Sequence, residues 1–484
     1  MMPQHEPHPP TLRLLSRRGL LEGGLGLGAV ACQWLLARDG RAVAEGTSAM
    51  QAGDAIGLPH HAPKAKRVVH LFMSGGPSHI DMFDPKPRLN ADDGEPIPKS
   101  IAGEFRFAMI RDAAPIVKGS PFTFTKHGRA GGDFSDLVPH IAKIADEITV
   151  IRSMVTDTVV HDPACWLMNS GSIRAGMPTM GAWLSWGLGN EADDLPAFVV
   201  LTSHAGGQAQ PLLESYWGSG FLPSQHQGVR LRSGGDPILF VSNPQGVSAR
   251  VRRRQLDALA GLNEERLARA HDPEIAARIA TYELAYRMQT SVPGLVDISA
   301  EPKHVHEAYG TTGAKPSFAN NCLLARRLLE RGVRFVQVYE MGWDQHGDLV
   351  NQIKKQCAAT DRASAALVAD LRDRGLLDDT LVIWSGEFGR TPVAEAKGEK
   401  WGRDHHPYGF TAWVAGGGFA QGKVVGATDD FGWHAIEKPV HVHDLHATAL
   451  HLLGIDHERF TFRHQGRDFR LTDVAGSVID DLFV

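Results

Sequence analysis

The segment Thr380–Pro392, TLVIWSGEFGRTP, constrains the fold of this chain more than any other part of its sequence. Its apolar, largely β-branched run ends abruptly in a turn of small residues that carries the carboxylate of Glu387. Such a run is typical of a buried parallel strand that delivers a charged group to the carboxyl edge of an α/β sheet. Residues 361–379 have apolar side chains at helical spacing, with Gly375 as a stop signal. The unit predicted is therefore a helix, a short loop, a strand and a functional turn.

Further apolar runs alternate with segments of helical spacing along the chain. Strands that alternate with helices indicate one α/β domain, with a central, mostly parallel sheet covered by helices on both faces. Residues 135–147 and 272–289 have helical patterns, and the region 205–330 is expected to form a helical insertion or cap. The predicted strands are Arg67–Met73, Ile148–Ser153, Ala197–Leu201, Val333–Tyr339, Thr380–Trp384 and Phe410–Val414.

Composition excludes some classes of function. With 484 residues and a formal net charge of -5, the chain is nearly neutral for its size. This balance argues against nucleic-acid binding and against a polybasic membrane patch. The four cysteines show no CxxC or zinc-finger spacing, so they predict no disulfide framework. The 24 histidines instead cluster near carboxylates, as metal sites require.

The N-terminus has the pattern of a targeting signal. Ser16–Leu21, SRRGLL, precedes a Gly-, Ala- and Leu-rich run over 23–37 and the AxA-like sequence of 42–44. This looks like a twin-arginine export signal with its cleavage site, so we expect transport by the twin-arginine translocase to the periplasm or the cell surface. The apolar run is too short and too rich in glycine for a spanning helix, so no membrane span is expected in the mature chain. A lipoprotein form is not expected, because Ala29 fits poorly upstream of Cys32.

These signals divide the chain into five parts. The small, polar residues after the signal read as a linker, and the α/β pattern fills most of the rest. The predicted parts are a signal peptide at 1–44, a linker at 45–65, an α/β domain at 66–476, the insertion at 205–330 within it, and a C-terminal tail at 477–484.

The turn after the first predicted strand, Ser74-Gly75-Gly76, has the composition of an anion-binding loop. Glycines let backbone N–H groups approach an anion closely. Just beyond lie His79 and Asp81, which are candidate metal ligands, and Ser78, a candidate nucleophile. The alternative is a tight strand-to-helix turn with polar surface residues.

Two other segments place histidine next to carboxylate beside predicted strands. Asp344 and His346 follow the strand at 333–339, and Asp404-His405-His406 precedes the strand at 410–414. A carboxylate with neutral imidazole suits Zn, Mn or Fe, and suits Ca or Mg less readily. Adjacent residues of an extended segment point to opposite sides, so only one of the two neighbouring histidines is expected to reach a metal. Ordinary surface loops are the alternative for both segments.

Three further segments supply candidate site residues. His161 begins the sequence HDPACWLMNSG, where it could ligate a metal, act as a base, form a covalent phosphoramidate or serve only as a structural residue at a helix start. Arg390, close to Glu387, is suited to clamp phosphate, sulfate or carboxylate. Asp444 is a candidate N-cap of a late helix, and it and His446 either line the site or are structural.

The mature chain resembles the exported sulfatase-like family catalogued as domain of unknown function 1501, within the alkaline phosphatase-like superfamily. The phrases that carry the resemblance are SGGPSHIDMFDPKP at 74–87, GEFGRTP at 386–392 and GRDHHP at 402–407. The resemblance implies a central sheet flanked by helices, with the site at its carboxyl end. Where sulfatases have their formylglycine cysteine, this chain has His161, and Cys165 falls on the arginine of the motif. Formylglycine chemistry is therefore not expected.

The resemblance and the residues together lead to a functional hypothesis. We expect a metal-dependent hydrolase of phosphate or sulfate esters, acting on a small-molecule or glycan ester outside the cytoplasm. One or two divalent ions (Zn, Mn, Fe or Ca) would be bound by Asp344, His346, Glu387 and His405, with Asp81 or His79 completing the set.

The same hypothesis assigns two other roles and leaves alternatives open. Arg390 would stabilise charge on the transferred group, and the nucleophile would be His161, Ser78 or a metal-activated water. The first alternative is a surface binding or assembly protein with a degenerate metal site. A mutase or transferase of the same superfamily is the second.

Overall fold

The computed structural model describes residues 57–483, except 104, 111–114, 233–242, 244–246, 271, 312, 314–315 and 396–397. The predicted signal peptide and the first part of the predicted linker lie outside these residues. Everything described belongs to one unit of the chain, which begins at Gln51. No helix in the described part is both long and apolar enough to cross a membrane.

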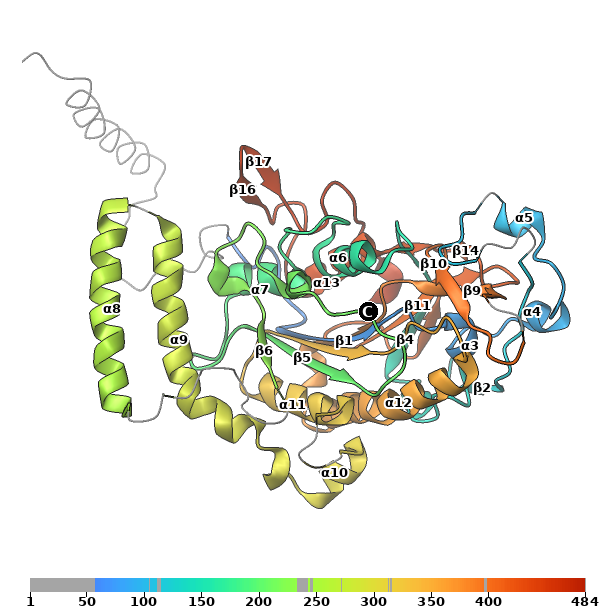
Figure 1. Cartoon of the computed structure of the whole chain (residues 1–484), viewed down its shortest axis with the longest axis horizontal. Coiled ribbons are helices and arrows are strands. Elements are labelled where there is room, and N and C mark those ends of the chain that lie inside the picture. The colour runs from blue at the N-terminus through green and yellow to red at the C-terminus, as the bar shows by residue number, and fades with distance from the viewer. Residues whose placement is uncertain are drawn as a thin grey trace, which may run out of the picture. The chain divides into compact units, whose positions relative to one another are not determined.

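A nine-stranded mixed sheet forms the centre of this unit (Figure 1). Its strands follow the order β12-β4-β11-β8-β1-β7-β5-β6, and β15 pairs with β4 as well. All the predicted strands are present, because each is a short apolar run that is buried along nearly its whole length. The bounds are β1 Arg67–Ser74, β4 Ile148–Val155, β5 Phe198–His204, β6 Val229–Leu231, β7 Phe335–Met341, β8 Thr380–Ser385, β11 Phe410–Ala415, β12 Lys423–Val425 and β15 Val440–His441.

The direction of the strands brings several loops to one edge of the sheet. Strands β8, β1, β7 and β5 run parallel to one another. Strand β11 is antiparallel to both β8 and β4, so β4 runs in the same direction as β8. The carboxyl ends of β4, β8, β1, β7 and β5 therefore share one edge, where sites of open α/β sheets are found.

Helices cover both faces of the sheet, as predicted (Figure 1). Alternate residues of a strand point to opposite faces, so Val69 and Leu71 of β1 join one apolar core while Val68 and Phe72 join the other. The first core contains α11 (Phe318–Glu330) and α12 (Leu349–Asp373). The second contains α6 (His161–Ser170), α7 (Met180–Leu188) and α13 (Val442–Leu452).

Smaller elements complete the unit. The short helices are α3 His79–Met82, α4 Pro87–Ala91, α5 Lys99–Ala102 and α10 Lys303–Tyr309. The two-stranded ribbons pair β2 Phe124–His127 with β3 Gly132–Ser135, β9 Gly389–Ala394 with β10 Arg403–His406, β13 Ala427–Thr428 with β14 Ala435–Glu437, and β16 Phe462–His464 with β17 Arg467–Phe469.

The structure corrects two predictions of segment type. Residues 135–147 form only a short 3-10 turn at Ile141–Ile144, because Pro139 cannot continue a helix. The region 205–330 is not a separate insertion, since β6 extends the sheet and α11 lies in the core.

What remains of the predicted insertion is chiefly a helical hairpin. Helices α8 (Ala249–Ala270) and α9 (Pro273–Val296) pack on each other, and Leu256 is the only buried residue recorded for α8 among the described residues. In the predicted C-terminal tail, Leu482 is fully buried, and its carbonyl accepts the Ala420 N–H at 2.8 Å.

Candidate metal centre

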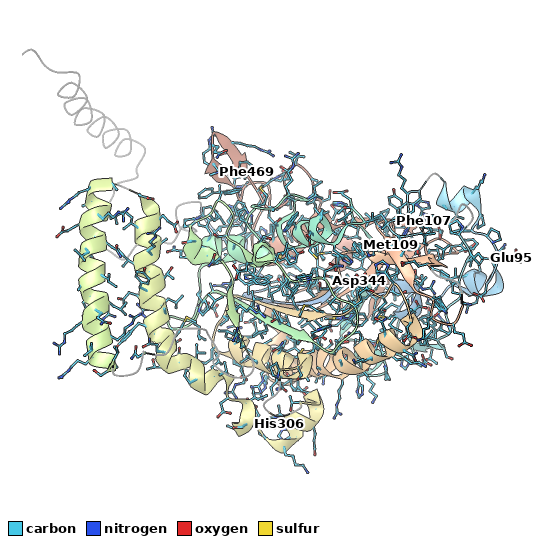
Figure 2. The ribbon with its side chains drawn as sticks, viewed as in Figure 1. Glu95, Phe107, Met109, His306, Asp344 and Phe469 are labelled. Carbon is cyan, nitrogen blue, oxygen red and sulfur yellow. The ribbon has the colours of Figure 1, made fainter. Side chains whose placement is uncertain are left out.

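Three imidazoles and one carboxylate converge at the carboxyl edge of the sheet. The carboxylate is that of Asp344, which Figure 2 labels. Oδ1 of Asp344 lies 3.1 Å from Nε2 of His161 and 2.8 Å from Nε2 of His346. It lies 3.2 Å from Nε2 of His405, which in turn is 2.9 Å from Nε2 of His346. We call these four residues the four-residue cluster. The sequence predicts all four as site residues, with metal binding as one of several roles left open for His161.

The parallel strand ends explain why these residues meet. Asp344 and His346 lie in the loop that follows β7, and His161 is the first residue of α6, which follows β4. His405 lies on β10, the second strand of the ribbon that follows β8. Three chain segments that are distant in sequence thus reach one point, because β4, β7 and β8 end at the same edge.

Glycines allow these loops to approach one another closely. A Cβ on Gly75 would lie 2.3 Å from the backbone N of Asp344, and the residue has φ of +122°. A Cβ on Gly402 would lie 2.0 Å from the carbonyl carbon of His346. Any side chain at either position would push apart the loops that carry the cluster.

Each histidine of the cluster is held by its second ring nitrogen. Nδ1 of His161 lies 2.7 Å from Oε1 of Glu387, and Nδ1 of His405 lies 2.7 Å from the carbonyl O of Val159. Nδ1 of His346 bonds to a carboxylate oxygen of Glu395. Carboxylates and carbonyls only accept hydrogen bonds, so each Nδ1 carries the proton and donates it. In the neutral imidazoles every Nε2 then turns a lone pair toward the cluster, as a metal ligand does.

Glu387 occupies a different position from the one predicted. It was expected to ligate the metal, but its two oxygens accept the Gly75 N–H at 2.9 and 3.1 Å and the proton of His161. The side chain is fully buried behind the imidazole. The glycine turn after β1 is indeed an anion-binding loop at Gly75, and the anion that it binds is this carboxylate. A direct role of Ser74 or Gly76 in binding a substrate anion has no support in this geometry.

Arg390 also differs from its predicted role as a clamp for the transferred group. Its guanidinium is fully buried, and it donates to Oδ1 of Asp344 at 2.8 Å. Its remaining donors bind backbone carbonyls: Nε donates to Gly76 at 2.9 Å, Nη1 to Arg403 at 2.9 Å, and Nη2 to Gly75. Because the side chain is fully buried behind these bonds, it is out of reach of a substrate, and this arginine positions Asp344 and ties the three loops together.

Three candidates from the segment after β1 lie outside the cluster. Asp81 is fully buried in a two-bond ion pair with Arg403, at 2.7 and 3.2 Å. Ser78 donates its hydroxyl proton to Asp81 at 2.5 Å, which removes it as a nucleophile. His79 lies 2.9 Å from the carbonyl O of Gly432. Asp81 and Ser78 are structural, because their polar groups are satisfied inside the protein. His79 is held through Nε2 alone, and its buried Nδ1 has no hydrogen-bond partner among the described residues.

The remaining candidates are placed as follows. His406 points away from His405, as the alternation of β10 requires, and it bonds to the carbonyl O of Trp433 at 2.5 Å. Asp404 accepts the backbone N–H of Met109 at 2.7 Å and lies near His346 and Glu395.

The two late candidates support helix packing. Asp444 completes the capping box of α13 by accepting the His441 N–H at 2.9 Å. His446 bonds to the carbonyl O of Met168 at 2.8 Å, and burial lowers its pKa to about 3. Neither contacts the four-residue cluster through a recorded bond.

The electrostatic environment favours a cation. Burial alone would raise the pKa of Asp344, but hydrogen bonds from the imidazoles hold it well below its ordinary value. Burial would lower the pKa of His161, yet Asp344 and Glu387 raise it to about 9. Burial also lowers the pKa of His346, but the hydrogen bonds with Asp344 and Glu395 outweigh it and raise the pKa above its ordinary value. When the imidazoles are neutral, the carboxylates of Asp344, Glu387 and Glu395 outnumber the guanidinium of Arg390. A divalent cation would balance this excess of negative charge.

The donor set fits a divalent metal. Ligand atoms about 2.1 Å from one ion lie about 3.0–3.4 Å apart at ordinary coordination angles, close to the 2.8–3.2 Å separations from Oδ1 of Asp344. Nε2 of His161 is buried and lies 3.1 Å from Oδ1 of Asp344, an approach that lacks the geometry of a hydrogen bond, as expected for two ligands of one metal. Three nitrogens and one oxygen suit Zn, Mn or Fe better than Ca or Mg.

One side of the cluster remains open. The side chains of His161, His346 and His405 are 10%, 11% and 8% exposed, whereas Asp344 is 1% exposed. Gln210, an exposed residue, donates to Oδ2 of Asp344 at 3.3 Å. Catalytic metal sites keep such an open position for water or substrate.

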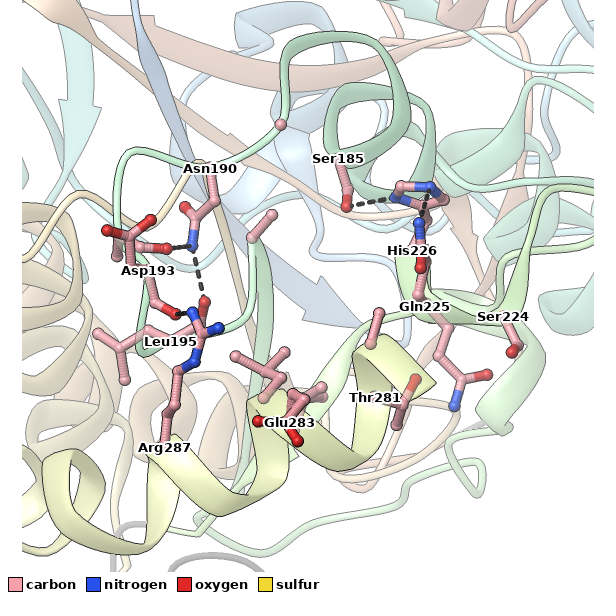
Figure 3. Close-up of a pocket in the computed structure, with 17 residues that line it drawn as sticks. Ser185, Asn190, Asp193, Leu195, Ser224, Gln225, His226, Thr281, Glu283 and Arg287 are labelled. Carbon is pink, nitrogen blue, oxygen red and sulfur yellow. Dashed lines mark hydrogen bonds between the residues drawn. The ribbon is translucent and has the colours of Figure 1, made fainter. Parts of the chain in front are cut away.

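A cavity of about 520 Å³ lies between α7 and α9, away from this chemistry (Figure 3). Ser185 and Nδ1 of His226 are 2.9 Å apart across one end of it, and burial lowers the pKa of His226 to about 4. At the other end Arg287 donates to the carbonyl O of Asp193 at 2.9 Å. No member of the four-residue cluster lines this cavity.

The model of the family described as "Protein of unknown function (DUF1501)" matches residues 65–483. This chain belongs to the DUF1501 family. The family predicted from the sequence motifs is thereby confirmed. A comparison with curated proteins found no match.

Solved structures give only distant similarities. A sulfatase from Pseudoalteromonas sp. shares 12% identity at a TM-score of 0.34, over 84% of this chain and 70% of that one. A protein in the alkaline phosphatase superfamily from Vibrio parahaemolyticus shares 11% identity at 0.35, over 83% and 70%. The phosphonate monoester hydrolase of Agrobacterium radiobacter shares 11% at 0.32, over 81% and 74%. Similarities of this size carry no argument about activity, which must come from the site itself.

Proposed function

We propose that this DUF1501 protein is a metal-dependent hydrolase of phosphate or sulfate esters that acts outside the cytoplasm. The observation that carries the proposal is the convergence of three Nε2 lone pairs on one carboxylate, each imidazole fixed from behind by an acceptor. When bound there, a divalent ion would polarise an ester oxygen and lower the pKa of water. The twin-arginine motif of Ser16–Leu21 supports the location.

The protein's own side chains would bind the metal ion and hold its ligands in place. His161, His346, His405 and Asp344 would hold the ion, while Arg390 fixes the orientation of Asp344. Glu387 and Glu395 keep their imidazoles in the tautomer that presents Nε2.

Water is the nucleophile that this arrangement favours. Nε2 of His161 faces Asp344 inside the cluster, and Ser78 is fully buried and bonded to Asp81. Neither of the two predicted protein nucleophiles is therefore presented to the open side. An ester that enters from that side would meet solvent water there.

Metal analysis and hydrolysis assays test the proposal together. The purified mature protein should bind about one equivalent of Zn, Mn or Fe and hydrolyse phenyl phosphate or phenyl sulfate. His405→Ala should lose both properties, whereas His204→Ala, which changes an exposed histidine at the end of β5, should retain both. Metal binding that survives His405→Ala, or hydrolysis that continues without metal, would overturn the proposal.

One observation favours a second candidate, a binding protein that holds a metal without catalysis. Arg390, the expected clamp for the transferred group, is fully buried and is bonded to Asp344 and to backbone carbonyls. A protein that loses metal with His405→Ala but hydrolyses neither ester in the metal-loaded form would fit this second function.

A further inference from the structure

A second cavity of about 520 Å³ is lined by residues that are close in the chain to His161 and His405, although no member of the four-residue cluster lines it. Val159, which lines it, accepts the Nδ1 proton of His405 at 2.7 Å. Pro407, also in its lining, is two residues beyond His405, and its carbonyl accepts the Thr156 N–H at 2.9 Å. The cavity and the cluster are therefore built on the same two chain segments.

Four of the ten residues that line this cavity carry aromatic rings: Phe105, Tyr408, Trp433 and His434. The ring of Phe105 lies edge-on to Tyr408 and Trp433, with centroids 5.6 and 5.1 Å apart. Tyr408 in turn stacks on His434 at 5.6 Å. Trp433 is fully buried, whereas Tyr408 is 43% exposed. Planar apolar faces of this kind give large contact area to a flat ring.

The rim of the cavity is polar. Arg106 and Asp157 are exposed there, and Thr158 is half-buried between Asp157 and Val159. An occupant would thus meet an apolar wall along its face and charged or hydroxyl groups at its edge. A six-membered ring with polar substituents matches both features.

Two exposed apolar side chains belong to chain segments close to the cluster. Val160, which directly precedes His161, is 56% exposed, and Met109, whose N–H binds Asp404, is 53% exposed.

We propose that this aromatic cavity, lined by Phe105, Tyr408, Trp433 and His434, is the subsite for the organic part of the substrate, and that it selects an ester of a six-membered ring with a polar edge. An aryl ring and a pyranose ring share this chemistry. The inference rests on the proposed ester hydrolysis at the four-residue cluster.

Kinetics with matched esters test the subsite. Tyr408→Ala should raise KM about tenfold for phenyl phosphate or for glucose phosphate, with kcat retained, because it removes stacking area and no metal ligand. KM for methyl phosphate, which has no ring, should not change. If KM rises for phenyl phosphate the subsite binds an aryl ring, and if it rises for glucose phosphate the subsite binds a pyranose ring. If sulfate esters are the substrates, the corresponding sulfates are measured in the same way.

Two control variants separate stacking from folding. Tyr408→Phe keeps the ring and should restore the KM of the ring ester. Tyr282→Ala removes a tyrosine of α9 that is also 43% exposed, and it should leave all three substrates unaffected. A Tyr408→Ala variant that changes KM equally for ring and methyl esters, or that changes neither, overturns the subsite while hydrolysis itself stands.

A binding measurement that does not require turnover separates the subsite from the proposed function. Phenyl phosphate and glucose phosphate are offered to the His405→Ala protein, and bound ester is detected by saturation-transfer NMR. One of the two esters should bind to the His405→Ala protein. It should fail to bind to the double variant that carries both His405→Ala and Tyr408→Ala. Tyr408-dependent binding by a protein whose wild type hydrolyses no ester would refute the proposed function and leave the subsite. Absence of binding to either protein would refute the subsite.

Discussion

Replacing Glu387 by glutamine tests the idea that this carboxylate acts on the metal through His161. Glutamine has nearly the same shape, and its amide oxygen can still accept the Gly75 N–H that now lies 2.9 Å away. The bond to Nδ1 of His161, 2.7 Å long, loses its charge-assisted character. Such bonds contribute about 1.5–3 kcal/mol against about 1 kcal/mol for neutral ones.

The loss of about 1–2 kcal/mol corresponds to a roughly tenfold weaker metal affinity, within the 10- to 100-fold range typical of residues that support metal ligands. Competition with a chromophoric chelator measures the dissociation constant for Zn. Glu437→Gln, which changes an exposed glutamate on β14, is the matched control and should leave the constant unchanged. An affinity of Glu387→Gln equal to that of the wild type would refute the reasoning, and complete loss of binding would instead indicate that Glu387 is itself a ligand.

Three other predictions follow from the same structure. Arg390→Met should destabilise the metal-free protein by about 3–5 kcal/mol in chemical denaturation, because it leaves Asp344 buried without its cation; a change below about 1 kcal/mol would contradict this. Gly75→Ala should abolish metal binding in a titration, since its Cβ would lie 2.3 Å from the backbone N of Asp344, whereas Gly94→Ala, with φ of +92° and open space around it, should bind metal normally. Burial raises the pKa of Glu340 from 4.5 to about 7, so the contribution of Glu340 to stability is full below pH 4.5 and is lost as the pH rises through 7. The Glu340→Gln variant should therefore be more stable than the wild type at pH 8 but not at pH 4. An equal difference in stability at both pH values would refute the shift.

The sheet could be read from the sequence because its strands are short, continuous apolar runs. Residues 67–73 and 380–384 carry apolar side chains on both sides of the strand, so both faces are expected to be buried. Each run is followed by small residues that end the strand. Helical patterns were less decisive. In residues 135–147 Pro139 outweighed the apolar spacing, and at 205–330 composition could not show that α11 belongs to the core.

The candidate ligands could be found for a similar reason, since polar residues at the carboxyl ends of parallel strands share one edge. What could not be read was which of two carboxylates faces the cluster. Glu387 and Asp344 look alike in sequence, and only the approach of Gly75 to the Glu387 oxygens distinguishes them. The burial of Arg390 likewise depends on carbonyls of distant loops.

Two partners of the cluster carry almost no sequence signal. Val159 acts through its backbone carbonyl, which any residue has, so its type gives no indication of the contact with His405. Glu395 lies in the loop after β9 and outside the motif at 386–392, and its bond to His346 appears only in three dimensions.

Anomalous diffraction from crystals of the Zn-loaded protein tests the central claim most directly. The account predicts one anomalous peak bounded by Nε2 of His161, His346 and His405 and by a carboxylate oxygen of Asp344, with Zn–N and Zn–O distances of about 2.0–2.2 Å. Glu387 should remain hydrogen-bonded to Gly75 and out of contact with the ion. A peak coordinated by Glu387, or one located at His79 and Asp81, would contradict the account.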